Sequence, residues 1–481
     1  MSDISKNSLR ICLLKLNCHF TWDLQKEDID LHDAEEKIDA QLEYLTLKSN
    51  ISLFNLMAYV KHLRGQNEEA LENLKSALEC IEEGDEDQVE KKSLVTWGNY
   101  AWIYYHMDRL PEVQTYLDKV EASCKRLSSP FSYKIELPEI ECEKGWSFLK
   151  FGGRYYERAK ACFEKALESD PDHPEFSTGF AIVMYRMDEF YKEGGGNKSL
   201  SLNPLKKALE LNPKGTFIKV LLALKLQDIE EGSKGEKYIK EALEQVAFEP
   251  YVFRYAAKFY RRNNNLERAM ELLQQALRQL PTSAFLHHQM GLCYRSQIVQ
   301  IKKANGNISR GNCKAEVDKL IQRTIFHFEK AVKQKSLFVY AFLDLAKIYK
   351  EAGQVKKAED IFQKVLRIEH VTEEEKQQAH LRYGQFLEFH KRDRDLAMYH
   401  YLEGIKINPK FCTLLVDALK NLALKQLNHN TFHAKSLGAL GFIHKLNGKN
   451  KQAIEYYESA LKQDPNNSEY ISALVELRLS I

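Results

Sequence analysis

The segment YVFRYAAKFYRRNNNLERAMELLQQALRQLP, residues 251–281, predicts the architecture of the whole chain. It contains three small residues, Ala257, Ala269 and Ala276, the second twelve positions after the first and the third seven after the second. The bulky Leu273 lies four positions after the second alanine, and Pro281 ends the segment. Small residues at this spacing let two antiparallel helices approach closely, and the bulky side chain fills the space between them.

The same spacing occurs in seven windows of the chain. Six windows keep a small or short residue at all three positions, whereas the seventh has Gln385 at the first. A proline closes four windows at one common offset, at Pro171, Pro281, Pro409 and Pro465. This pattern is typical of tetratricopeptide repeats, whose helix pairs stack on one another. The triples are Ala58/Ala70/Ala77, Ala101/Val113/Val120, Ser147/Ala159/Ala166, Ala257/Ala269/Ala276, Ala346/Ala358/Val365, Gln385/Ala397/Gly404 and Gly441/Ala453/Ala460.

We therefore predict an all-α chain, a tetratricopeptide-repeat superhelix (solenoid) with a positively charged central groove or tunnel. Only 22 glycines and 11 prolines among 481 residues agree with an almost wholly helical chain. Three groups of helices are expected: an amino-terminal cap with the first repeats at 1–135, central repeats at 136–280, and carboxy-terminal repeats at 281–481. Residues 189–203 and 303–316 lack periodicity and are predicted to be exposed loops.

Composition excludes several functional classes. The net charge of +2 hides any concentration of one sign on a single face. Nine scattered cysteines without a Cys-x-x-Cys pair predict reduced thiols in a cytoplasmic protein, with no disulfide frame and no metal site. No apolar run is long enough to cross a membrane, and no phosphate loop or nucleophile elbow is found. The chain is therefore predicted to bind rather than to catalyse.

The small residue fixes the rotation of the first helix in each repeat, so the face opposite to it can be read from the sequence. In 251–262 this face carries aromatic and basic residues at i, i+3, i+4 and i+7 spacing. Such a mixture suits single-stranded nucleic acid, because cations meet phosphates and rings stack on bases. For any one residue, a solvated cation or simple packing is at least as good an explanation. Binding is favoured by six of them together, on successive helices: Arg254, Tyr255, Lys258, Arg261, His288 and Arg295. The full set of such residues is Tyr185, Arg186, Tyr251, Arg254, Tyr255, Lys258, Arg261, Arg262, Phe285, His288, Gln289, Arg295, Tyr340, Lys347 and Lys350.

Several longer strings resemble one family, the interferon-induced proteins with tetratricopeptide repeats. They are Cys18–Trp22, Ala58–Leu63, Ser93–Gly98, Leu221–Asp228, Ala256–Arg262 and Leu286–Arg295. The amino-terminal segment and Glu476–Ile481 are most similar to its fifth member, and Glu157–Glu168 is more similar to its first.

The resemblance implies an antiviral, interferon-induced protein of the cytoplasm that captures the 5′ end of single-stranded foreign RNA. The RNA carries a 5′-triphosphate, or a cap lacking ribose 2′-O-methylation, and its translation is blocked. Contacts go to phosphate, sugar and stacking faces, so no base sequence is read.

The resemblance also assigns roles to positions of this chain. Gln41, Lys150 and Arg186 match the residues that hold the terminal phosphates, and Lys37 would add attraction for them. Trp146 matches the ring on which the cap guanine stacks, with Leu45 and Ile182 lining that pocket; a core tryptophan is the alternative. Phe338 and Tyr340 match downstream stacking positions. The first nucleotides are expected to contact Tyr156, Tyr251, Arg254, Tyr255, His288 and Gln289.

Lys37 lies where the resemblance gives threonine in the triphosphate-preferring member and arginine in the cap-binding member, so its charge favours the cap-binding type. Leu47 replaces a threonine of the cap-binding member, so the balance between capped and triphosphate ends stays open. Tyr457 and Leu461 keep a Tyr-x-x-x-Leu motif that the resemblance links to hetero-oligomers of family members. No cofactor is expected, although a divalent ion accompanying the triphosphate is left open. The alternative function is a repeat scaffold that binds the acidic peptide tails of protein partners.

Overall fold

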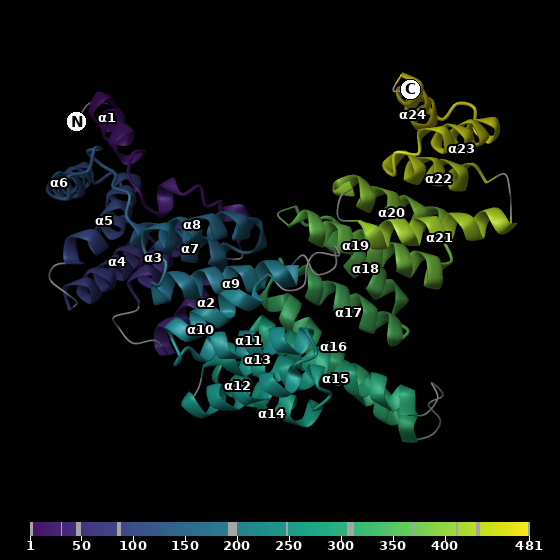
Figure 1. Ribbon diagram of the computed structural model, residues 1–481, viewed down its shortest axis with the longest axis horizontal. Helices are drawn as coiled ribbons and strands as arrows, with labels where there is room; N and C mark the ends of the chain where they lie inside the picture. Colours follow the sequence, from purple (N-terminus) through teal and green to yellow (C-terminus); the bar gives the residue numbers. More distant parts are fainter. Residues whose placement is uncertain are drawn as a thin grey trace. The chain divides into compact units, whose positions relative to one another are not determined.

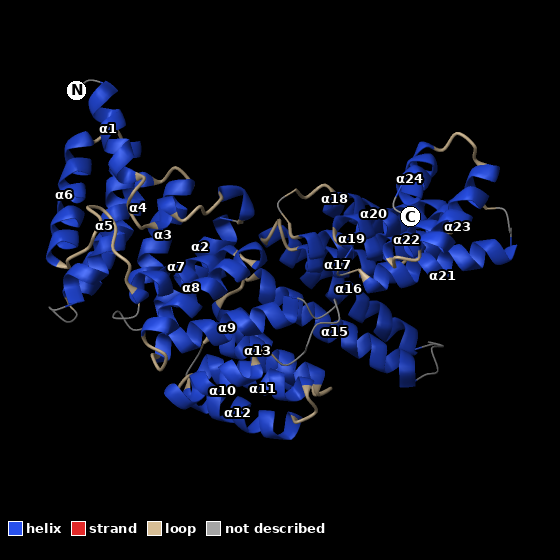
Figure 2. Ribbon diagram, turned by 45° about the horizontal axis from the view of Figure 1, so that its top comes forward, coloured by secondary structure: helices blue, strands red, loops and turns tan. Residues whose placement is uncertain are grey.

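The computed structural model describes residues 3–29, 31–44, 50–83, 88–190, 200–246, 249–304, 312–369, 371–409, 412–429 and 433–479. Within these ranges the regular structure is helical, with no strand (Figure 2). The predicted all-α repeat fold is therefore confirmed. The chain forms two compact units, residues 1–337 and 338–481, and the finer division at 135 and 280 stays a prediction.

Antiparallel helices follow one another throughout the first unit (Figure 1). Short 3₁₀ turns at His19–Thr21 and Lys26–Asp28 lead into the repeats. The α-helices are α1 Asp3–Leu13, α2 Leu31–Tyr44, α3 Ile51–Leu63, α4 Asn67–Glu82, α5 Val89–His106, α6 Leu110–Arg126, α7 Pro138–Phe151, α8 Tyr156–Ser169, α9 Pro174–Phe190, α10 Leu202–Leu211, α11 Thr216–Asp228, α12 Gly232–Gln245, α13 Pro250–Arg262, α14 Leu266–Gln279, α15 Ala284–Ala304 and α16 Asn312–Gln334.

The second unit continues the same helical pattern with one irregular turn. A π-helical turn, Leu387–Lys391, directly follows α19. The α-helices are α17 Val339–Glu351, α18 Val355–Leu366, α19 Glu373–Phe386, α20 Arg394–Ile407, α21 Thr413–His429, α22 Ala434–Leu446, α23 Asn450–Gln463 and α24 Ser468–Leu479.

Bulky side chains pack on small residues across each helix pair, as the spacing predicts. All seven windows correspond to consecutive helix pairs, and their bulky residues are buried. Phe163 lies so close to Gly179 of the next repeat that a Cβ there would be 2.2 Å from its ring. The four prolines each follow a helix end by two residues. These contacts set the rotation of each helix, and therefore which residues face outward from the core.

Three further helix pairs are not among the seven predicted windows. The α11–α12 pair nevertheless has the predicted spacing, with Ala223, Gly235 and Ala242 as the small residues and a buried Ile239 between them. In α9–α10 and α15–α16 the connection is longer than in the other repeats. The second helix of such a pair keeps the repeat pattern, as Thr324, Phe328 and Ala331 show in α16. Its small residue, however, is no longer twelve positions after the small residue of the first helix.

Gln385 departs from the repeat because the chain contains one extra residue at this point. The small position is held by Gly384, where an added Cβ would lie 2.4 Å from the ring of Tyr401. Gln385 is exposed. The π-turn Leu387–Lys391 absorbs the additional residue before α20 begins, since a π-turn has more residues per turn than an α-helix.

The predicted loops are shorter than expected from the sequence. Helix α9 extends to Phe190 and α15 to Ala304, while α16 begins at Asn312. The ends of 189–203 and 303–316 are therefore helical, which corrects the prediction, because a polar sequence can still continue a helix that packs at its other end. The central residues 191–199 and 305–311 lie outside the described residues.

Candidate RNA 5′-end site

A lysine and an arginine meet where α2, α7 and α9 approach one another in the first unit. The Lys150 ammonium, in the last turn of α7, donates a hydrogen bond to the Gln41 side-chain oxygen on α2. Arg186, in the last turns of α9, lies near enough for its charge to act on Lys150. The three residues that the sequence assigned to the terminal phosphates are thus brought together.

The charge on Lys150 is weakly stabilised in this position. Burial of its ammonium, together with the nearby positive charge of Arg186, lowers the pKa of Lys150 to about 7. In the described part of the chain, no carboxylate forms an ion pair with either cation. Two like charges that share a poorly solvated space repel each other, and an anion placed between them would relieve that repulsion.

Tyrosine side chains surround the guanidinium of Arg186. Burial opposes its charge, but the neighbouring phenols of Tyr255, Tyr156, Tyr251 and Tyr185 act in the opposite direction and raise its pKa above the usual range. The guanidinium carbon lies 5.9 Å from the centre of the Tyr255 ring. The Lys150 ammonium lies 5.8 Å from the ring of Tyr251. Rings and cations are therefore adjacent, but Tyr185 and Tyr255 are only 1% and 4% exposed, so these two rings, predicted to face the groove, are packed in the core instead.

A second group of rings continues from Tyr255 along the starts of the following helices. Arg254 lies over the ring of Tyr255 at 5.2 Å and over that of Phe285 at 4.2 Å. Phe217, at the start of α11, contacts the rings of Tyr251 and Tyr255 at centroid distances of 5.7 and 5.6 Å. A guanidinium held between rings has the geometry of a stacking platform for bases.

Phe217 is not among the residues predicted from the sequence, although its position in the repeat is regular. It lies six residues before Ala223, as Tyr251 lies six before Ala257 and Phe285 six before Gly291. Recognition of α11–α12 as a repeat would have placed Phe217 at the same position as the two predicted aromatics.

Part of the positive charge predicted on α13 is neutralised. Lys258 forms an ion pair with Glu189, and Arg262 pairs with Glu189 at 3.5 Å and with Asp228 at 3.1 Å. These acids come from α9 and α11, so the sequence of α13 alone could not reveal them. The ion pairs fasten α13 to its neighbours, which makes Lys258 a weaker candidate for RNA contact than Arg254.

The candidate cap pocket is described in part. Trp146 is half-buried, and its ring meets Phe163 edge-on at 5.3 Å. Ile182 is buried on α9. Leu45 and Leu47 lie outside the described residues, and so does the side chain of Lys37. The structure therefore shows a tryptophan supported by the core on one edge, and does not test its stacking role.

The remaining candidates divide between the two units. In the first unit His288, predicted to face the groove, is mostly buried beside Phe328, with ring centres 5.5 Å apart. Three other candidates of this unit are half-buried: Gln289, Arg261 and Arg295.

Other candidates lie in the second unit. Phe338 and Tyr340, at the start of α17, are half-buried. Tyr457 is only 4% exposed within the core of α22–α24, and Leu461 is half-buried.

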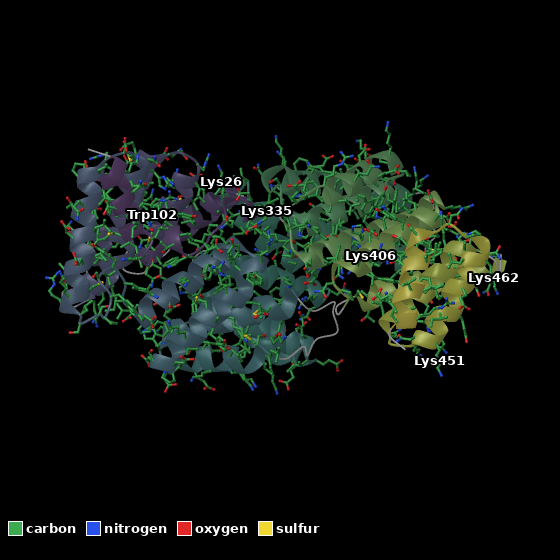
Figure 3. The ribbon with its side chains drawn as sticks, turned by 90° about the horizontal axis from the view of Figure 1, so that it is seen from above. Lys26, Trp102, Lys335, Lys406, Lys451 and Lys462 are labelled. Atoms are coloured by element: carbon green, nitrogen blue, oxygen red, sulfur yellow. The ribbon has the colours of Figure 1, made fainter. Side chains whose placement is uncertain are left out.

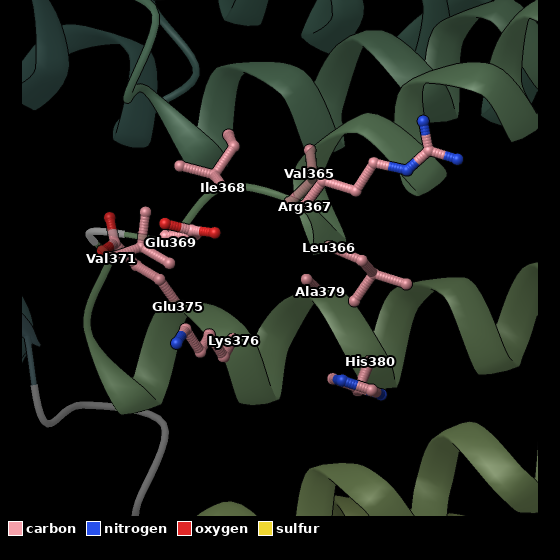
Figure 4. Close-up of a pocket in the computed structure, with 10 residues that line it drawn as sticks. All are labelled: Val365, Leu366, Arg367, Ile368, Glu369, Val371, Glu375, Lys376, Ala379 and His380. Carbon is pink, nitrogen blue, oxygen red and sulfur yellow. The ribbon is translucent and has the colours of Figure 1, made fainter.

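Other features of the described chain do not coincide with this cluster. A pocket of about 160 Å³ in the second unit lies between α18 and α19, and its lining includes Arg367, Lys376, Glu369 and Glu375 (Figure 4). Other lysines, such as Lys451 and Lys462, are exposed, and the exposed Lys406 pairs with Glu403 at 2.9 Å (Figure 3). Across the described ranges, no group of three metal-ligating side chains occurs. No helix there combines the length and apolar character that a bilayer crossing requires.

Comparison with known proteins supports the repeat fold. Tetratricopeptide-repeat models match residues 153–173, 340–368 and 434–467. The human antiviral innate immune response effector IFIT1 is 52% identical over 452 residues, which covers 94% of this chain and 95% of that protein. Human interferon-induced protein with tetratricopeptide repeats 2 is 43% identical and covers 96% of this chain and 97% of its own length.

Solved structures agree with these relatives. An IFIT1 monomeric mutant bound to Gppp-AAAA is 50% identical and superposes with a TM-score of 0.85, covering 95% of this chain and 99% of its own. The human IFIT1 dimer with PPP-AAAA gives 0.80 at 49% identity, over 94% of this chain and 99% of that one. At this identity and coverage, the chain belongs to the family of interferon-induced proteins with tetratricopeptide repeats.

Proposed function

We propose that this protein binds the 5′ end of single-stranded foreign RNA in antiviral defence. The observation that carries the proposal is the pair Lys150 and Arg186, two half-buried like charges without a carboxylate partner among the described residues. A triphosphate supplies several negative charges in a small volume, so it would neutralise both cations at once. The relatives bound to Gppp-AAAA and PPP-AAAA support this ligand class.

Nucleotides beyond the phosphates would stack on the rings that adjoin the cations. Tyr251, at the start of α13, and Phe285, at the start of α15, are half-buried, and the Arg254 guanidinium lies 4.2 Å from the centre of the Phe285 ring. This arrangement supports base-independent binding, because every base has a face that can stack. A peptide scaffold needs cations but gains little from such rings, so the observations favour RNA over the acidic-tail alternative.

Binding would act by sequestering the RNA end and thereby blocking its translation, without any chemical step. We place the protein in the cytoplasm, which is supported by its nine free cysteines. Association with family members is proposed through α23. In the relative, a monomeric mutant replaces two leucines seven positions apart; here Ile454 and Leu461 have that spacing and are half-buried beside Tyr457.

A gel-shift series with one RNA sequence tests the proposal. The RNA carries in turn a triphosphate, an unmethylated-ribose cap, a methylated-ribose cap or a 5′-hydroxyl. We expect tight binding of the triphosphate or the unmethylated-ribose cap, and weak binding of the 5′-hydroxyl RNA. Equal binding of all four RNAs would show that the end is not recognised.

A further inference from the structure

The π-turn between α19 and α20 presents an aromatic and basic surface that the 5′-end site does not use. Phe389 in this turn is 60% exposed, and His390, Lys391 and Arg392 beside it are exposed as well. Arg392 has a left-handed backbone with φ of 58°, which is uncommon for a residue with a side chain. Irregular turns inside helices often occur at functional sites.

Several cations of this surface form no ion pair with a carboxylate of the described chain. Lys391 pairs with Glu359 at 2.9 Å and Lys425 with Glu388 at 3.4 Å. Asp393 accepts a hydrogen bond from the Leu396 backbone and caps α20. Among the described residues no ion pair is found for Lys350, Arg392 or Arg394, so their charges are available to an external anion.

One contact involves the exposed ring itself, and one electrostatic interaction links the turn to α17. The Lys425 ammonium lies 5.6 Å from the centre of the Phe389 ring, over one of its faces. Lys350, near the end of α17, lies close enough to His390 to lower its pKa further after burial has done so. Lys350 and Tyr340 both lie on α17 and are both predicted to face the groove, so the turn adjoins a residue already predicted to contact RNA.

We propose that the surface around Phe389 binds the body of the single-stranded RNA, with one base stacked on the ring and phosphates paired with Lys350, Arg392 and Arg394. The inference rests on the proposed function, because it assumes that the bound chain is RNA. A stacking ring surrounded by cations fits nucleic acid better than an acidic peptide, which has no base to stack.

Fluorescence anisotropy with the full chain tests this surface. One probe is a 5′-triphosphate RNA of four adenylates, and the other is the same RNA extended to roughly sixteen nucleotides, the upper end of common single-strand sites. We expect the longer RNA to bind more tightly. Phe389→Ala should weaken the longer RNA about fivefold, near the lower end of what one stacked base contributes, and leave the short RNA unchanged.

Matched controls separate this effect from general surface changes. Phe131 is 53% exposed and has Lys134 at 6.0 Å from its ring, so Phe131→Ala removes a similar group elsewhere and should change neither affinity. The double variant Arg392→Gln/Arg394→Gln should lower the salt slope of the longer RNA by about 1.4, at 0.7 per phosphate contact. Arg278→Gln, an exposed arginine on α14, should leave that slope unaltered.

Each outcome decides the proposal. Loss of the length-dependent gain in Phe389→Ala, with an upward shift of the His390 pKa by NMR when the longer RNA binds, supports it. Equal affinities of Phe389→Ala and wild type for the longer RNA overturn it, as does an equal loss for both lengths. Displacement of an acidic peptide, with no effect on RNA, would assign the surface to a peptide instead. If 5′-hydroxyl and triphosphate RNAs bind equally, the 5′-end proposal fails, whereas a Phe389 effect on the 5′-hydroxyl RNA still supports this one.

Discussion

Triphosphate binding should draw a proton onto Lys150, and this makes RNA affinity depend on pH. In the free protein Lys150 has a pKa of about 7, so it is half protonated at neutral pH. A triphosphate beside it favours the charged form and returns its pKa at least to the ordinary 10.5. Binding then takes up roughly half a proton at pH 7 and nearly a whole one at pH 8.5.

The magnitude follows from these two pKa values. Between pH 7 and pH 8.5 the affinity for 5′-triphosphate RNA should fall roughly fifteenfold, because the free lysine must gain its proton from a more alkaline solution. Below pH 7 the free lysine is already charged, so its contribution to the pH dependence disappears. Isothermal titration in buffers of different ionisation enthalpy measures the proton uptake directly.

Two substitutions make this test specific to Lys150. Lys150→Arg keeps a charge at every pH of the experiment, so affinity should persist with little dependence on pH. Lys150→Met removes the charge, so the RNA affinity should be low and independent of pH. The reasoning is refuted if wild type and Lys150→Arg show the same slope between pH 7 and pH 8.5, or if wild type takes up no proton at pH 8.

The lowered pKa of Lys150 also predicts that the stability of the RNA-free protein depends on pH. The folded-state pKa of Lys150 lies below the unfolded value, so the penalty is present in full below about pH 7 and is relieved as the pH rises toward 10.5. At about 1.4 kcal/mol per pKa unit the upper limit is on the order of 5 kcal/mol, and the partial exposure of the side chain reduces it. Lys150→Met should therefore stabilise the RNA-free protein in urea unfolding at pH 6, and less so at pH 9.

Further substitutions address other parts of the molecule. Arg186→Ala should abolish triphosphate binding in gel shifts, since Lys150 alone cannot neutralise the phosphates; retained affinity would remove Arg186 from the site. Trp146→Ala should weaken capped RNA alone, and an equal loss for triphosphate RNA would make it a structural residue. Leu461→Glu should shift any oligomer to monomer in light scattering, because a carboxylate would replace an apolar contact on α23. Gly291→Val should destabilise the fold by about 1–3 kcal/mol in thermal unfolding, because a Cβ there lies 2.4 Å from Phe328.

The sequence predicts repeats where the spacing between their small residues is constant. Phe163 and Tyr457 pack on the preceding helix of their own pair, and the small residues of the two helices are twelve positions apart in each of these pairs. The α9–α10 and α15–α16 pairs escape because their connections differ in length, although the contacts themselves persist, as between Gly291 and Phe328. The predicted small position at Gln385 is wrong by one residue for a related reason. The π-turn adds a residue between the two helices, and Gly384 packs on Tyr401 instead.

Charge is harder to predict than packing, because it depends on partners that are distant in the sequence. The basic face of α13 is evident from its own residues, but Glu189 and Asp228 arrive from other repeats and neutralise Lys258 and Arg262. The rings, in contrast, follow the repeat. Aromatic residues recur six positions before the small residue in four successive repeats, at Phe217, Tyr251, Phe285 and Tyr340. The positions of these rings are thus encoded periodically, whereas the proposed RNA-end site depends on Lys150 and Arg186, whose repulsion exists only after α7 and α9 have packed together.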